Sequence, residues 1–304
     1  MFGAMAKWVV QIDDADRIPE FVARAFHTAT SGRPGPVVIA LPEDMLLDEV
    51  SVEDTPPYVV TQAYPSPNQL NQFETLLSQA QRPLVIAGGS TWTFEATQLL
   101  QQFAMCHHLP VCSAFRSQDY FDNNHPLYAG HVGLAINPKL AERVREADLL
   151  IVLGDRLSEA TSGTYSLVTS PVPRQKLIHV HPDALEIGRV FQPTLGIVSG
   201  MMQCMEALVT LPASSAQGAW TEWAGKARQD YESHIFPGSL SSGVDLAQAI
   251  TALREVLPED AIVCNGAGNY TAWLHRYFKY RGYRTQLAPV NGAMGYGVPA
   301  AVAA

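Results

Sequence analysis

The chain has 304 residues, of which 47% are hydrophobic and 16% charged, and its formal net charge is −9. This balance fits a globular protein of about two domains and excludes a disordered chain. The acidic charge argues against a nucleic-acid partner, because phosphate backbones would be repelled.

The sequence shows no sign of membrane association or export. No apolar run approaches the ~20 residues that cross a bilayer. The short apolar stretch near the N-terminus ends at Gln11 and Asp13, which does not fit a signal peptide. We therefore predict a cytoplasmic protein without a membrane partner. The four cysteines form no Cys-x-x-Cys pair, so neither a zinc site nor a disulfide framework is indicated.

The first predicted elements are one helix and one strand. Pro19 suits the first turn of a helix. The apolar residues that then recur on one helical face are Val22, Ala25, Phe26 and Ala29. Residues 32–36 break this helix, and residues 37–41 follow as a short apolar strand. A helix and a strand cannot bury a core alone, so we expect residues 1–47 to be the end of a domain. The proline-bearing residues 48–67 predict a linker.

Residues 68–211 predict a complete α/β domain. The expected strands lie at residues 84–87, 110–112, 149–153, 177–180 and 196–198. The helix between the first two carries Leu99, Leu100, Phe103 and Ala104 on one side. Apolar strands separated by helices indicate a parallel sheet that is covered on both faces. The predicted fold class is therefore α/β, with a doubly wound, Rossmann-like central domain and partial α/β domains at both ends.

Two further segments follow the central domain. In the connector at residues 212–243, Trp220, Trp223 and Tyr231 have near-helical spacing and predict a helix packed on a neighbour. Residues 244–304 begin another α/β unit, with a strand at 261–264. Its first helix has an apolar face formed by Leu246, Ala249, Ile250, Leu253 and Leu257.

Two glycine-rich segments of the last unit could bind a ligand. Residues 266–268 form a Gly-x-Gly turn between a strand and a helix, where the backbone can approach a phosphate. Such turns are common, so a purely structural turn is the alternative. Residues 292–297 hold three glycines around Met294, which would expose backbone groups and present one apolar side chain. The alternative here is a glycine-rich turn with Met294 in the core.

Together these segments resemble the thiamine-diphosphate enzymes of the acetolactate synthase and pyruvate oxidase group. The resemblance rests on Gly266-Ala267-Gly268-Asn269-Tyr270, on Trp273, and on the run from Gly292 to Ala301. Residues 35–44 are similar to the end of the family's pyrimidine-binding domain, and residues 82–89, 147–156 and 179–188 are similar to its central domain. The resemblance implies three pieces: 1–47 from the pyrimidine-binding domain, 68–211 the whole central domain, and 244–304 the start of the diphosphate-binding domain.

The resemblance also implies roles for single residues. Gly266, Gly268, Asn269 and Tyr270 would line the diphosphate of the cofactor. The Gly292 carbonyl would accept a hydrogen bond from the 4′-amino group of the aminopyrimidine, and the Met294 N–H would bind a ring nitrogen. Ala293 and Gly295 would complete this segment of the pocket. The catalytic role would belong to the Met294 side chain, which would hold the cofactor bent so that its 4′-imino nitrogen lies beside the thiazolium C2–H.

The implied activity is that of a lyase or carboligase (a transferase in the synthases) acting on 2-oxo acids. The implied cofactors are thiamine diphosphate and Mg²⁺, and the implied assembly is a homodimer or homotetramer. The family's catalytic glutamate and its magnesium-binding loop would lie outside this chain, so we predict no metal ligands here and expect the chain alone to be inactive. The alternative function is a non-catalytic nucleotide-binding or assembly module derived from this family.

Some central domains of the family bind FAD, and here the pattern is altered. Arg156 is retained in a Gly-x-Arg motif, but Ala160 stands where flavin members carry a second arginine. The Gly-Met-His-Gly type segment is replaced by Gly130-His131-Val132-Gly133. These departures disfavour FAD. His179 and His181 lack a carboxylate or cysteine at ligand spacing, so we predict hydrogen-bonding roles for them.

Overall fold

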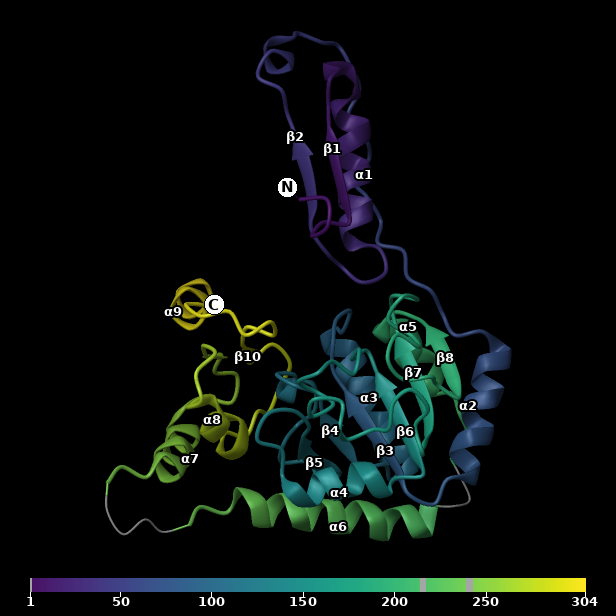
Figure 1. The fold of residues 1–304 in the computed structure, drawn as a ribbon, viewed down its shortest axis with the longest axis vertical. Helices are drawn as coiled ribbons and strands as arrows, with labels where there is room; N and C mark the ends of the chain where they lie inside the picture. The colour runs from purple at the N-terminus through teal and green to yellow at the C-terminus, as the bar shows by residue number, and fades with distance from the viewer. Residues whose placement is uncertain (1, 214–216, 239–242) are drawn as a thin grey trace. The chain divides into compact units, whose positions relative to one another are not determined.

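The computed structural model describes residues 2–213, 217–238 and 243–304 (Figure 1). Residues 214–216 and 239–242 of the predicted connector thus lie outside the described residues. The chain divides into two units, Met1–Ala63 and Tyr64–Ala304, and each is described by itself.

The N-terminal unit is a two-stranded parallel sheet with one α-helix. Its elements are β1 (Trp8–Gln11), η1 (Ala15–Arg17), α1 (Ile18–Thr30), β2 (Val37–Ala40) and η2 (Met45–Leu47). The helix and β2 are confirmed, and the helix carries its proline at the predicted end. Strand β1, which pairs in parallel with β2, was not predicted. Two strands give α1 little surface to cover.

The predicted apolar face of α1 is therefore only partly correct. Ala25 is buried, but Val22 and Phe26 are 37% and 51% exposed. Phe26 instead stacks on Tyr58, with ring centroids 5.3 Å apart. The buried residues of this unit are few, and its main core cluster comprises Ile12, Ala15 and Met45.

The second unit contains the large sheet. Its elements up to the last strand of that sheet are α2 (Pro67–Gln79), β3 (Pro83–Ala87), α3 (Phe94–His107), β4 (Val111–Ser113), η3 (Gln118–Tyr120), β5 (Tyr128–His131), α4 (Pro138–Glu146), β6 (Leu149–Leu153), β7 (Lys176–His181) and β8 (Leu195–Val198). The strand order is β5-β4-β3-β6-β7-β8, and all the pairings are parallel. The predicted α/β fold class is thereby confirmed. The chain starts in the middle of the sheet and reverses between β3 and β6, which is the doubly wound arrangement.

Both faces of this sheet are buried. On one face Val85 and Ala87 pack with residues of α2, α3 and α5 (Met201–Leu208). On the other face Leu84 and Ile86 pack with residues of α4. Successive side chains of a strand point to opposite faces, so a strand buried on both sides must be apolar at every position. This explains the uninterrupted apolar runs of the sequence.

Helix α6 (Gln217–Ile235) is the predicted tryptophan-bearing helix, and its packing on a neighbour is confirmed. The indole N–H groups of Trp220 and Trp223 donate to the backbone oxygens of Ala80 and Pro83, at 3.0 and 2.9 Å. Both indoles are buried, so these bonds satisfy donors that have lost water. The helix is thus fixed to the start of strand β3.

The remaining elements are α7 (Leu246–Val256), β9 (Val263–Cys264), α8 (Thr271–Tyr277), β10 (Gln286–Leu287) and α9 (Gly297–Ala303). Strands β9 and β10 pair in parallel. The predicted apolar face of α7 is only partly correct, because Ile250 and Leu257 pack on the core while Leu246 and Leu253 are 40% and 43% exposed. The two-stranded sheet again gives the helix a narrow surface to cover.

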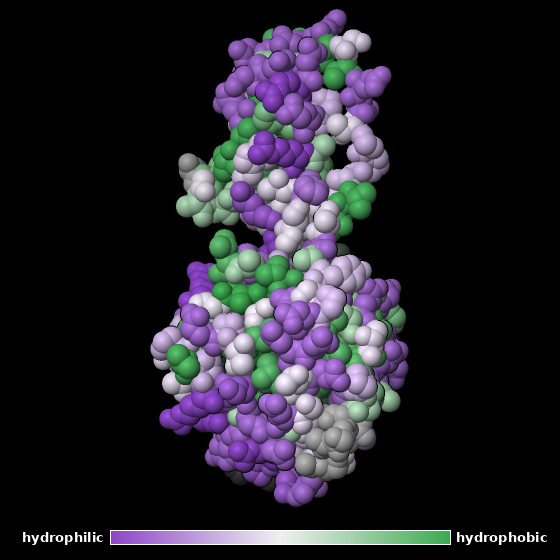
Figure 2. All heavy atoms as spheres, turned by 90° about the vertical axis from the view of Figure 1, so that its right-hand side faces the viewer, coloured by the Kyte–Doolittle hydropathy of each residue, from purple (hydrophilic) through white to green (hydrophobic). Residues whose placement is uncertain are grey.

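Across the described residues, no helix combines the length and apolar character that a membrane crossing requires. Figure 2 shows a largely hydrophilic face on which hydrophobic side chains also reach the surface. Globular proteins ordinarily keep much apolar area on their surface, so these exposed side chains alone mark no site.

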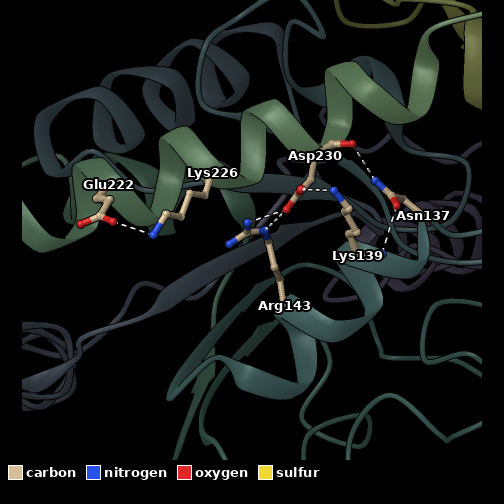
Figure 3. Close-up of polar contacts among 6 residues, drawn as sticks. All are labelled: Asn137, Lys139, Arg143, Glu222, Lys226 and Asp230. Carbon is tan, nitrogen blue, oxygen red and sulfur yellow. Dashed lines mark hydrogen bonds and ion pairs between the residues drawn. The ribbon is translucent and has the colours of Figure 1, made fainter.

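Helix α6 is also tied to α4 by a charged contact, which Figure 3 shows. The carboxylate of Asp230 accepts from Arg143 Nε at 2.8 Å and pairs with Lys139 Nζ at 3.1 Å. Asn137 donates to the Asp230 backbone oxygen at 3.0 Å. The Arg143 side chain is only 12% exposed, so its charge depends on this partner.

We predict that Asp230→Ala lowers the free energy of unfolding by about 2 kcal/mol, because it leaves a nearly buried guanidinium without its carboxylate. The control is Glu222→Ala, which removes the exposed Glu222–Lys226 pair on the same helix and should cost less than about 0.5 kcal/mol. Urea denaturation of both variants measures the difference. Equal losses would show that the Asp230 contact has no special role.

Candidate cofactor-binding site

The two glycine-rich segments lie next to one another. One follows β9 and the other follows β10, and the carboxyl ends of parallel strands lie at the same edge of a sheet. The Asn265 N–H donates to the Leu287 oxygen at 3.0 Å and extends this pairing. A Cβ atom on Gly297 would lie 3.0 Å from the Gly266 nitrogen, so the start of α9 touches the first segment. The structure thus brings together segments that the sequence separates.

The first segment is closed by its own tyrosine. The Gly266 N–H donates to the hydroxyl oxygen of Tyr270 at 2.8 Å. A Cβ on Gly268 would lie 2.6 Å from the Tyr270 ring, so a larger residue at that position would push this ring aside. An oxygen atom therefore already accepts from this backbone N–H. Tyr270 is 54% exposed, so its side chain has room to turn and leave this N–H to a phosphate oxygen.

The second segment is open. Gly292 and Gly295 have φ values of 75° and 82°, which glycine adopts most readily, and no atom lies within 4 Å of a Cβ built on either. The Met294 side chain is 92% exposed. Met294 is therefore not packed in a core formed by the described residues. The backbone and the methionine side chain are free to contact a ligand, as the predicted roles require.

A buried polar network joins these segments to the central sheet. Gln118 donates from its backbone N–H to Gln286 Oε1 and from its side-chain amide to the His275 oxygen, both at 2.8 Å. The Asp119 carboxylate accepts from the N–H groups of Thr285 and Gln286, at 3.1 and 3.3 Å. Burial raises the pKa of Asp119 to about 6, although these backbone bonds oppose the shift. The sequence does not predict this network, because a short polar turn resembles any surface loop.

Three histidines lie near the same junction. Burial lowers the pKa of His131 to about 4, that of His234 to about 4 and that of His275 to about 3. The rings of His131 and His275 lie edge to face, with centroids 5.7 Å apart. They are neutral in the folded protein at pH 7.

The place where a dinucleotide would bind in a doubly wound sheet is the switch point between β3 and β6. Here a Cβ on Gly89 would lie 1.8 Å from the Gly154 oxygen, so the two loops that follow these strands are in contact. The buried indole of Trp92 donates to the Gly88 oxygen at 2.8 Å, beside them. Arg156 instead lines a cavity of about 380 Å³ that Ala160 and Asn291 also border. The prediction against FAD stays a prediction.

Metal binding has no visible centre in the part of the chain that the structure describes. No group of three or more His, Cys, Asp or Glu side chains that could hold a metal ion is found there. His179 hydrogen-bonds through Nε2 to the Asp155 backbone oxygen at 2.9 Å, and His181 bonds the Asp183 backbone. These contacts agree with the hydrogen-bonding roles predicted for both histidines.

Comparison with known proteins defines the class. Residues 70–208 match the model of the thiamine pyrophosphate enzyme central domain. Residues 70–208 are therefore a thiamine pyrophosphate enzyme central domain, and the predicted recognition is confirmed.

Its relatives include large subunits of acetolactate synthase. The chain is 30% identical to the acetolactate synthase large subunit of Corynebacterium glutamicum, over 96% of this chain and 48% of that protein. It is 28% identical to the probable acetolactate synthase large subunit of Methanocaldococcus jannaschii, over 100% of this chain and 54% of that protein. It is 31% identical to acetolactate synthase 1, chloroplastic, of Zea mays, over 96% of this chain and 47% of that protein. The chain thus spans about half the length of the curated relatives it matches.

The buried histidines predict a pH effect on stability. Their pKa values lie below the ~6.5 of an unfolded chain, so the unfolded state takes up protons first as the pH falls. The contribution of these groups to the free energy of unfolding is therefore fully present above pH 6.5, and it is lost as the pH falls toward 4. Asp119 and Asp155, whose pKa values burial raises to about 6, act in the opposite direction. Three histidines near the junction outweigh two carboxylates, so the free energy of unfolding should fall between pH 7 and pH 5.

The variant that tests this effect is His275→Phe, which keeps a ring but removes one titrating group. Because His275 stays neutral in the folded state, it should lower the free energy of unfolding by about 2 kcal/mol at pH 5 relative to pH 7. Urea midpoints at the two pH values should therefore differ less for the variant than for the wild type. An unchanged difference would mean that His275 is protonated in the folded protein.

Proposed function

We propose that this protein is a thiamine-diphosphate-dependent lyase or carboligase that acts on 2-oxo acids and uses Mg²⁺ as a second cofactor. The observation that carries the proposal is the contact between two glycine-rich segments at the ends of the adjacent parallel strands β9 and β10. Homology to acetolactate synthases over nearly the whole chain supports it. Bound thiamine diphosphate would supply the reactive carbon and the electron sink of such a reaction.

The first segment would hold the diphosphate. Gly266 and Gly268 give the backbone its close approach, and Asn269 and Tyr270 lie at the exposed rim of the same turn. The Gly266 N–H would exchange the Tyr270 hydroxyl for a phosphate oxygen, which is a stronger acceptor because it is charged. Tyr270 would then be free to cover the bound group.

The second segment would hold the aminopyrimidine. The Gly292 carbonyl would accept from the 4′-amino group, and the Met294 N–H would donate to a ring nitrogen. Ala293 and Gly295 flank this contact, and both are exposed. Because Met294 is 92% exposed, its side chain is available to support the cofactor in its bent form. It would thereby keep the reacting groups within reach of one another.

The remaining assignments belong to the same proposal. The substrate would be a small 2-oxo acid, and the protein would form a homodimer or homotetramer without a nucleic-acid partner. The domain pieces would be residues 1–47, 68–211 and 244–304. Calorimetric titration of the full-length protein with thiamine diphosphate and Mg²⁺ tests the proposal directly. A protein that binds no thiamine diphosphate would favour the alternative, a non-catalytic assembly module.

We predict that Met294→Ala in the full-length protein lowers turnover of a 2-oxo acid by about 100-fold, because the cofactor loses its near-attack geometry. The free energy of unfolding should stay nearly constant, since an exposed side chain makes little packing energy. The matched control is Met105→Ala, which truncates a methionine that is 52% exposed on α3 and should leave both quantities unchanged. Wild-type turnover by Met294→Ala would show that the Met294 side chain has no catalytic role.

A further inference from the structure

Arg116 is an unusual residue beside the candidate site. It follows β4 in the central sheet, yet its guanidinium reaches both glycine-bearing loops. Nη1 donates to the Pro289 oxygen, just after β10, and Nη2 donates to the Gly266 oxygen at 3.4 Å, just after β9. One rigid fork therefore joins the two loops on which the proposed site is built.

The conformation and burial of Arg116 both lower the stability of the folded protein. Arg116 has a φ of 59°, which is unfavourable for a residue with a side chain. It is only 8% exposed, and its Nε has no hydrogen-bond partner. No carboxylate of the described residues forms an ion pair with it. Backbone strain and a buried charge without a carboxylate partner both lower stability, so packing alone does not account for this arrangement.

We propose that Arg116 is a positioning residue for the cofactor, which sets the spacing between the Gly266 turn and the loop that leads from Pro289 to Gly292. The inference rests on the proposed function. Arg116 itself touches no reacting atom. The two carbonyls it holds belong to the loops whose N–H and C=O groups would bind the two ends of the cofactor. A displacement of one loop would separate these groups from a ligand that must reach both.

Another arginine of the chain provides a matched control. Arg254 is 6% exposed, its Nη2 donates to the backbone oxygens of Leu257 and Pro258, and its Nε is also without a partner. It lies over the Phe278 ring, as Arg116 lies over Phe115. Arg254 holds the end of its own helix α7 and no glycine segment. The two residues thus share burial, chemistry and bonding, and differ in what they hold.

The experiment compares Arg116→Lys with Arg254→Lys in the full-length protein. Both keep the charge and remove the planar fork. Titration with thiamine diphosphate and Mg²⁺, followed by tryptophan fluorescence, should show affinity about tenfold or more weaker for Arg116→Lys, and wild-type affinity for Arg254→Lys. A third variant, Arg116→Gly, relieves the backbone strain, and millimolar methylguanidinium should restore part of its affinity while methylammonium should not.

Each outcome decides the matter. Equal affinities of the wild type and both Arg116 variants would overturn the positioning role while leaving the proposed function intact. Equal weakening in the Arg116 and Arg254 lysine variants, or no rescue by methylguanidinium, would reduce Arg116 to an ordinary stabilising residue and overturn the inference. A wild type that binds no thiamine diphosphate would overturn the proposed function and the inference with it.

Discussion

The candidate site depends on the buried carboxylate of Asp119. It accepts from two backbone N–H groups at the start of β10, and it does so at the cost of burying a charge. Without this contact the two-residue strands β9 and β10 would have little to hold them, because a two-stranded sheet is marginal by itself. Gln118 adds two further bonds from the same turn. The central sheet thereby supplies the rigidity that the glycine-rich segments lack.

The fold of the central domain could be predicted from the sequence because its strands are buried on both faces. Burial of that kind requires apolar runs such as residues 149–153, which stand out in any sequence. Strand β5 (Tyr128–His131) escaped prediction because it includes Gly130 and His131. Its polar side chains are accommodated by contacts with distant residues, among them the ring of His275. A local pattern does not contain that information.

The candidate site, like the central domain, could be predicted from the sequence only in part. The glycine segments could be found because glycine at close spacing has a direct physical meaning for the backbone. The residues that hold those segments could not, since Gln118 and Asp119 contact partners more than 150 positions away, at His275, Thr285 and Gln286. A polar turn that bonds water and a polar turn that bonds a distant strand have the same composition. Only the tertiary structure distinguishes them.

Glycines do opposite things at two places in this chain. At the switch point of the large sheet, Gly89 allows the loop after β3 to touch Gly154, and the buried indole of Trp92 donates to the Gly88 oxygen beside them. At Gly292 and Gly295 no atom lies near the missing side chain, so the backbone stays open. The same residue type thus brings two loops together at one place and leaves the backbone open at another. The open segment also carries the exposed Met294, and this combination is what the proposed contact with the aminopyrimidine requires.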